Sequence, residues 1–82
     1  MHYVYILKSL KDDDLYVGQT EDLKKRFKEH NDGKSISTKA RRPFKLIYYE
    51  AYETSQLAIV RERSIKKFGQ SYYQIKKRIG LI

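Results

Sequence analysis

The sequence contains no cysteine and only one proline. The lack of cysteine excludes disulfide bonds and thiolate zinc sites, so packing alone must stabilise the fold. No apolar run approaches the roughly 20 residues that a membrane-spanning helix needs. The N-terminus also lacks the basic stretch and apolar segment of a signal peptide. We therefore expect a cytoplasmic protein, with which the missing cysteines agree.

Internal repeats, low-complexity tracts and flexible linkers are absent too, which predicts one domain over residues 1–82. Positive charge is in excess: 18 Lys and Arg stand against 10 Asp and Glu, a net charge of +8. Because each phosphate that a protein neutralises releases condensed counterions, this excess favours a nucleic acid as partner. Charge alone does not distinguish binding from cutting.

Two alternating segments open the chain. In residues 2–9 the side chains alternate between two faces, with Tyr3, Tyr5 and Leu7 on one and Val4 and Ile6 on the other, and residues 15–20 form a second strand after a polar turn at 11–14. So short a connection predicts an antiparallel hairpin. Thr20 is expected to cap the helix that follows.

The remaining elements follow from periodicity and from helix-stop residues. The first helix is predicted to end at Asn31-Asp32-Gly33, and a basic loop follows at 34–43. A third strand spans 44–52. The second helix starts at Thr54 or Ser55 and runs to about Phe68, with Gly69 as terminator, and a short helix spans 70–79. This order, β-β-α-β-α-α, predicts an α/β (α+β) fold: a small three-stranded, mainly antiparallel sheet flanked by helices.

Tyr5 and Tyr16 lie on the two strands of the predicted hairpin. If the pairing puts them on one face, two phenol hydroxyls project into one cleft. The alternative is that they serve packing only, since tyrosine is a common half-buried strand residue and this chain has eight.

Arg26 and His30 stand four residues apart, which places them on one face of the first helix. Arginine suits forked contact with phosphate oxygens, and Lys25 flanks the pair. The alternative is a solvated basic face on which the charge of His30 is favourable near the helix C-terminus.

Glu62 is the lone acidic residue of a basic segment in the second helix. It falls at the margin of the stripe that we expect to be buried, which consists of Leu57, Ala58, Ile65 and Phe68. One or two carboxylates with waters and substrate phosphates are the ligands that Mg²⁺ prefers. The alternative is a surface carboxylate paired with Lys66.

In this order and at these spacings, the residues resemble the GIY-YIG endonuclease family over nearly the whole chain. The short length and basic C-terminus resemble its small stand-alone, single-domain members. The matching segments are Tyr3-Val4-Tyr5, Tyr16-Val17-Gly18, Gln19-Thr20, Lys25-Arg26 with His30, and residues 58–67. The chain departs from the family in two places. Tyr3 replaces the usual glycine, and no asparagine follows Asn31 although several family nucleases carry one, which leaves a role for Gln74 open.

The resemblance implies phosphodiester hydrolysis with a single Mg²⁺ or Mn²⁺ ion held by Glu62. It implies that Tyr16 is the general base, that Tyr5 positions the water or phosphate and that His30 relays a proton from Tyr16. Arg26 would stabilise charge on the phosphoryl oxygens, and Gly18 would allow close backbone approach beside the site. We expect further nucleic-acid contacts from Lys25, Lys39, Arg41, Arg42, Arg61 and Lys66.

The expected substrate is DNA rather than RNA, cut nonspecifically or by structure, in repair or recombination. A homodimer or a recruiting protein stays open. The first alternative is a non-catalytic nucleic-acid-binding module that keeps the fold, and the second is a basic domain that docks on an acidic protein.

Overall fold

Three antiparallel strands form the centre of the fold, which a computed structural model describes for residues 1–82. Strand β1 (His2–Ser9) pairs with both β2 (Leu15–Thr20) and β3 (Phe44–Tyr52), so the sheet order is β2-β1-β3. Both pairings are antiparallel. The predicted α+β class and the predicted order of elements are confirmed.

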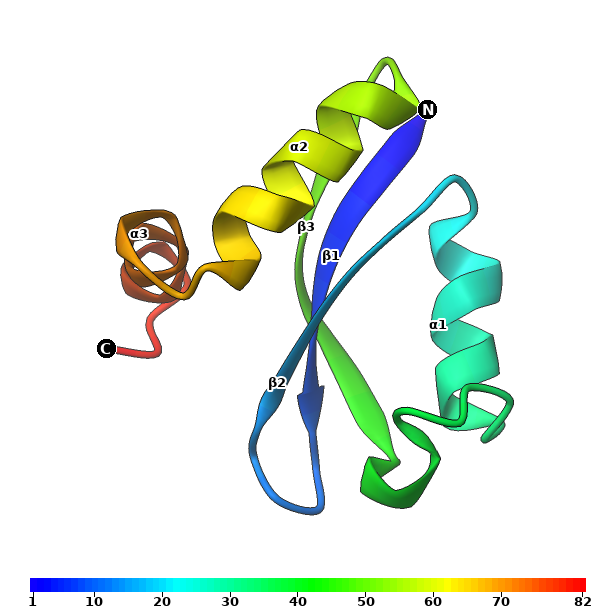
Figure 1. The fold of residues 1–82 in the computed structure, drawn as a ribbon. Helices are drawn as coiled ribbons and strands as arrows, with labels where there is room; N and C mark the ends of the chain where they lie inside the picture. The colour runs from blue at the N-terminus through cyan, green and yellow to red at the C-terminus, as the bar shows by residue number, and fades with distance from the viewer.

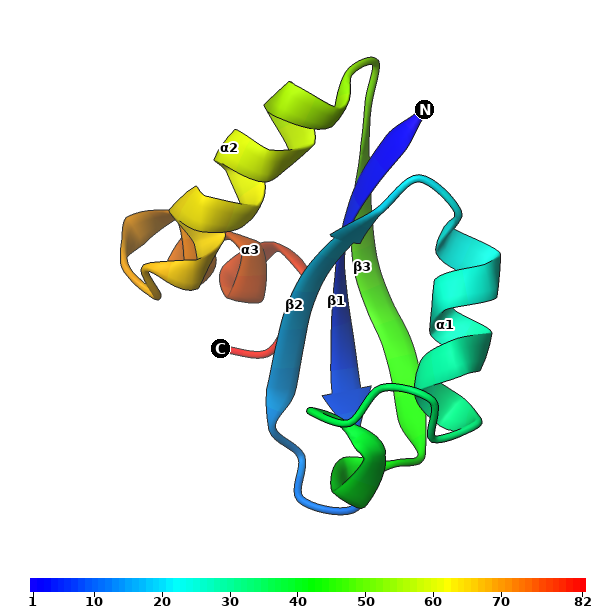
Figure 2. The same cartoon turned by 45° about the vertical axis from the view of Figure 1, so that its right-hand side comes forward.

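Helices cover both faces of the sheet (Figures 1 and 2). Helix α1 (Leu23–Asn31) lies on one face, and α2 (Ser55–Lys66) and α3 (Gln70–Arg78) lie on the other. A 3₁₀ turn, Lys39–Arg41, occupies part of the segment predicted as loop. None of the helices combines the length and apolarity that crossing a membrane requires.

The alternation of β1 divides the buried residues between these two faces. Val4 and Ile6 pack against α2 and α3, whereas Tyr5 and Leu7 face α1. The first cluster contains Val4, Ile6, Val17, Ala58, Ile65 and Ile75. The second is built on Tyr5, Leu7 and Phe44. Strand β1 therefore contributes side chains to both clusters, and the two clusters differ in composition.

Helix α1 begins later than the sequence suggested. Strand β2 continues through Thr20, so the cap is Asp22, whose carboxylate accepts a hydrogen bond from the Lys25 amide at 3.0 Å. The predicted stop at Asn31 is confirmed. The Asn31 side chain bonds both backbone groups of Phe44, at 2.6 and 3.2 Å, and so fixes the end of α1 to the start of β3.

Helix α2 is capped by Thr54, one of the two predicted residues, but two other expectations for it were wrong. The helix ends at Lys66, and Phe68, with φ of 54°, makes the turn, while Gly69 precedes α3. Leu57 and Phe68 are exposed. Ala58 and Ile65 define the buried face; Leu57 falls to the side of it by roughly 100° or a little less, and Phe68 lies beyond the end of the helix.

Candidate active site

Tyr5 lies buried at the centre of the sheet, opposite Gly18 of β2. A Cβ atom at position 18 would lie 2.5 Å from the Tyr5 hydroxyl oxygen, so glycine leaves the room that the phenol occupies. We expected Gly18 to allow close approach of backbone beside the site. The group that approaches it is the Tyr5 ring. Gly18 of the Tyr16-Val17-Gly18 segment thus makes room for Tyr5 of the Tyr3-Val4-Tyr5 segment.

The Tyr5 hydroxyl keeps its proton at neutral pH. Burial raises the pKa of Tyr5 to about 12, a charge on Tyr16 acts in the same direction, and nearby Arg26 acts against both. A protonated phenol donates a hydrogen bond, which suits the orientation of a water or a phosphate oxygen. It does not suit the removal of a proton.

His30 is fully buried at the end of α1 and joins two elements by hydrogen bonds. Its Nε2 lies 3.0 Å from the Tyr5 hydroxyl, and its Nδ1 lies 2.7 Å from the Thr38 hydroxyl. Burial and the charge of Arg26 lower the pKa of His30 to about 4, so the ring is neutral at pH 7. The alternative of an exposed, charged helix-end histidine was therefore wrong.

Tyr16 lies on the same sheet face as Tyr5, two residues further along the hairpin, where it pairs with Leu7. Its ring centroid is 5.0 Å from that of His30 and 6.4 Å from that of Tyr5. The expected shared face is confirmed. The hydroxyl of half-buried Tyr16 makes no hydrogen bond within the protein, whereas that of Tyr5 is engaged by His30.

Arg26 extends from α1 beside these aromatic rings. The guanidinium contacts Glu29 at 3.3 Å and the Ser35 hydroxyl at 3.5 Å. Both contacts are long, and the side chain is partly exposed. A phosphate could therefore take the place of either partner, and a guanidinium is suited to forked contact with phosphate oxygens.

Glu62 lies on α2, on the opposite side of the sheet from α1. It lies on the face that carries Ala58 and Ile65, and its side chain is 18% exposed. Besides burial, which is the main cause, the negative charge of Glu62 contributes to the raised pKa of Tyr5. Its ion pair is with Lys66 at 3.5 Å, as the surface alternative predicted.

The carboxylate of Glu50 on β3 offers a contrast, because its hydrogen bonds are fully used. Arg61 donates to both of its oxygens, at 2.8 and 3.0 Å, and the hydroxyls of Tyr48 and Tyr52 donate to them as well. Burial alone would raise the pKa of Glu50, but these bonds lower it to about 2. This cluster fixes α2 on β3 next to Glu62.

The donor set fits one divalent ion. No group of three or more His, Cys, Asp or Glu side chains gathers anywhere in the structure. Glu62 offers a half-buried carboxylate with a single long ion pair. One carboxylate completed by waters and substrate phosphates is a common Mg²⁺ environment, so Glu62 suits that ion and Glu50, already saturated, does not.

The predicted phosphate-binding residues fall into two groups. Lys25, Lys39 and Arg42 are exposed and have no ion pair. The others are engaged within the protein: Arg61 with Glu50, Lys66 with Glu62, and Arg41 with Asp12 at 3.4 Å.

Sequence reasoning missed Thr38, which is buried in the 34–43 segment and holds His30. A Ser/Thr-bearing loop carries no periodic signal that would single it out. Gln74 is exposed on α3, and no hydrogen bond joins it to the site. Gln74 therefore makes no hydrogen bond that would replace the missing asparagine at the site.

Comparison with known proteins places this geometry in a family. The family model of the GIY-YIG catalytic domain matches residues 1–78. A UPF0213 protein of Staphylococcus saprophyticus is 44% identical over 82 residues, covering 99% of this chain and 93% of its own. One of Clostridium perfringens is 50% identical over 72 residues, covering 87% and 76%.

A solved structure agrees with the fold. The solution NMR structure of a UPF0213 protein from Bacillus halodurans has a TM-score of 0.55 and 34% identity to this chain. The match covers 98% of this chain and 83% of that one. The names of these relatives assign no activity.

Proposed function

The chain belongs to the GIY-YIG catalytic-domain family, whose members are generally endonucleases, and we propose that it is a metal-dependent endonuclease acting on DNA. One observation carries the proposal. Two motif tyrosines and a buried histidine pack together on one sheet face, and Arg26 and Glu62 both contribute to the pKa of Tyr5.

Glu62 would hold Mg²⁺ or Mn²⁺. When bound, such an ion supplies a Lewis acid to a nonbridging phosphate oxygen and to the leaving group. Lys66 is the present partner of Glu62 and is released when a cation takes its place. Arg26 binds the phosphoryl oxygens and stabilises the charge that accumulates there.

Tyr16 is the proposed general base because its hydroxyl is not committed to another protein group. In its phenolate form it accepts the proton of the attacking water, while the water oxygen bonds to phosphorus. The bond from phosphorus to the leaving sugar oxygen then breaks. Tyr5 keeps its proton and donates a hydrogen bond that orients the water or the phosphate.

His30 acts on Tyr5 rather than on Tyr16 in this proposal. The sequence suggested a proton relay from Tyr16, but the hydrogen bond of His30 is to Tyr5. A neutral imidazole has one donor and one acceptor nitrogen. In the tautomer that the proposal requires, Nδ1 accepts from the Thr38 hydroxyl and Nε2–H donates to the Tyr5 oxygen, which leaves the Tyr5 proton free for the water or phosphate.

Exposed Lys25, Lys39 and Arg42 would contact the DNA backbone. Such contacts position a nucleic acid but do not read its sequence, which supports nonspecific or structure-selective cutting. We also propose DNA rather than RNA as the substrate, a role in repair or recombination, and a cytoplasmic location. Self-association or recruitment by another protein is left to experiment.

A non-catalytic nucleic-acid-binding module is the second candidate. It is favoured by the ion pair between Lys66 and Glu62 and by the exposed position of Gln74, away from the site. Binding would then use the same basic surface, without a reaction at Glu62.

Cleavage of labelled duplex, single-stranded, flap and junction DNA tests the proposal, with Mg²⁺, with Mn²⁺ and with chelator. We expect products that require metal and disappear in Glu62→Gln and in Tyr16→Phe, while binding persists. Glu53→Gln is the matched control, since Glu53 is exposed and outside the site. Salt-sensitive binding without metal-dependent products in wild type would select the binding module instead.

A further inference from the structure

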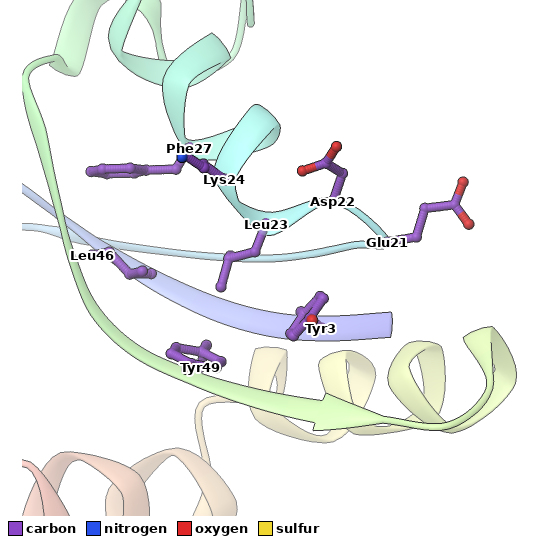
Figure 3. Close-up of a pocket in the computed structure, with 8 residues that line it drawn as sticks. All are labelled: Tyr3, Glu21, Asp22, Leu23, Lys24, Phe27, Leu46 and Tyr49. Atoms are coloured by element: carbon purple, nitrogen blue, oxygen red, sulfur yellow. The ribbon is translucent and has the colours of Figure 1, made fainter. Parts of the chain in front are cut away.

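A hollow lies between the start of α1 and the strands β1 and β3 (Figure 3). Its volume is about 450 Å³, within the range of small-molecule sites. Tyr3 and Tyr49 lie along one side of it, with Leu23, Leu46 and Phe27 completing the apolar lining.

The two tyrosines form an aromatic pair that is open to solvent. Their ring centroids are 6.0 Å apart, with the ring planes at 66°. Tyr49 is 54% exposed, and neither hydroxyl makes a hydrogen bond within the protein. An exposed aromatic surface of this kind is a platform on which a planar ring can stack.

The charges around the hollow select a base rather than a phosphate. Glu21 and Asp22 lie at the end of the hollow near Tyr3 (Figure 3). Lys24 also lines the hollow, so its charged lining is two carboxylates and one ammonium. The negative excess disfavours a phosphate at this place, whereas a nucleobase is neutral and presents a flat apolar face. We propose that the hollow binds one unpaired base of the nucleic acid, stacked on Tyr49 beside Tyr3.

The hollow adjoins the candidate active site. Glu21 and Asp22 also line a neighbouring polar hollow with Glu29, but that hollow contains two cationic side chains, Lys25 and Arg26, for a phosphate to contact. Tyr3 precedes Tyr5 by two residues on the same face of β1, a distance of about 7 Å along a strand. Nucleotides of a stacked strand are spaced by about 3.4 Å, so a base in the hollow lies within a few nucleotides of the phosphate at Arg26.

This inference rests on the proposed function and specifies its substrate: a nucleic acid with an unpaired base close to the cut bond. In an uninterrupted duplex the bases are paired and stacked, and one would have to leave the stack to reach Tyr49. A flap or single-stranded branch presents such a base without that cost. The substitution of Tyr3 for the motif glycine supplies one wall of the hollow.

Binding of a single-stranded oligonucleotide that carries one 2-aminopurine tests the inference in the absence of divalent metal. We measure anisotropy of an end label for affinity and 2-aminopurine fluorescence for stacking. In wild type, binding changes the 2-aminopurine signal. Tyr49→Ala is expected to weaken binding by roughly tenfold and to remove that change, with an unaltered dependence on salt. Tyr49→Phe keeps the ring and retains both.

Tyr73→Ala is the matched control, because Tyr73 is 50% exposed on α3, across the sheet from the hollow. It should bind like wild type. Equal binding by Tyr49→Ala and wild type would overturn the inference, as would a 2-aminopurine signal that binding leaves unchanged. So would an effect of Tyr49→Ala confined to self-association in sedimentation, or to capture of an apolar peptide. Because no metal is present, loss of the proposed cleavage would leave this readout intact.

Discussion

The two faces of the sheet are built from the same strand but bury different kinds of group. Toward α2 and α3, Val4 and Ile6 meet Ala58, Ile65 and Ile75, and the contacts are apolar. Toward α1, the hydrogen-bonded chain from Tyr5 through His30 to Thr38 is buried.

This difference separates most of the apolar packing from the buried chain of hydroxyls and imidazole, although Glu62 and the pair of Arg61 with Glu50 lie on the α2 side. An apolar layer is stabilised by area removed from water, whereas a buried polar group costs free energy unless it is hydrogen-bonded. Every buried polar side-chain atom in this protein has a partner. The α1 face can therefore hold oriented hydroxyls and an imidazole because the opposite face supplies most of the apolar packing.

The largest expected effect comes from breaking the apolar face. Ile65→Ala removes a fully buried side chain from the centre of that layer and should lower the free energy of unfolding by about 2–5 kcal/mol. Urea denaturation measures this. Cleavage per folded molecule should stay near wild type. Val60→Ala on the same helix is the control, since Val60 is 59% exposed; equal losses for the two variants would contradict the comparison.

The next effect breaks the α1 face. In Gly18→Ala the new methyl group would lie 2.5 Å from the Tyr5 hydroxyl oxygen, so the phenol must move. We expect a loss of about 1–3 kcal/mol in unfolding free energy and loss of cleavage even where the protein is folded. The hydrogen bond between Tyr5 and His30 can be followed through the imidazole NMR signals. A stable variant with full activity would show that Tyr5 need not lie over position 18.

A smaller expected effect is a pH dependence of stability that comes from the α1 face. The pKa of His30 is lowered to about 4 in the folded protein, so the unfolded chain binds the extra proton first. The stability that His30 contributes is complete above its ordinary pKa of 6.5 and is lost as pH falls toward 4, by on the order of 1–3 kcal/mol. Glu50, with its low pKa, contributes its own loss only below about 4.5.

Urea unfolding at pH 7 and at pH 5 measures this effect. Wild type should lose more stability over that interval than His30→Gln, which lacks the titrating group. Parallel profiles for the two proteins would mean that His30 does not remain neutral inside the fold. The apolar contacts on the α2 side do not titrate, so they would not produce a difference between the pH profiles of wild type and His30→Gln.

The smallest expected effect concerns Lys66. Its ion pair with Glu62 is long and Lys66 itself is exposed, so Lys66→Ala should change stability by less than about 0.5 kcal/mol. It should also strengthen metal binding, because the competing cation is gone. Calorimetric titration with Mn²⁺ gives the affinity. A weakened affinity would show that Lys66 supports the site rather than competing for Glu62.

Much of the fold followed from the sequence because its signals are local. Alternation predicted β1 and β2, the tract at 44–52 predicted β3, and Asn31-Asp32-Gly33 predicted the end of α1. The errors have tertiary causes. Leu57 is apolar yet exposed because the buried face of α2 is set by contact with the sheet, and Phe68 is exposed because the helix ends before it and the chain turns there. Asp22 replaces Thr20 as cap because pairing with β1 keeps Thr20 in the strand.

The candidate site was predictable as a set of residues but not as a set of contacts. The motif spacing predicted Tyr5, Tyr16, Arg26 and Glu62 as site residues, and the structure places the two tyrosines on one face. Nothing in it showed that His30 would bond Tyr5 and Thr38, since those partners are 25 and 8 residues away. The ion pair between Arg61 and Glu50 could not be predicted for the same reason, because the two residues are 11 positions apart in the sequence.

Paramagnetic broadening by Mn²⁺ in the presence of a non-cleavable oligonucleotide tests the central claim most directly. We predict loss of NMR signals from residues around Glu62 and from the adjoining parts of β1 and β2, and recovery of those signals in Glu62→Gln. Broadening centred on the acidic turn at 12–14 or on Glu21 and Asp22, and unchanged in Glu62→Gln, would contradict the assignment of Glu62 as the metal ligand of a hydrolytic site.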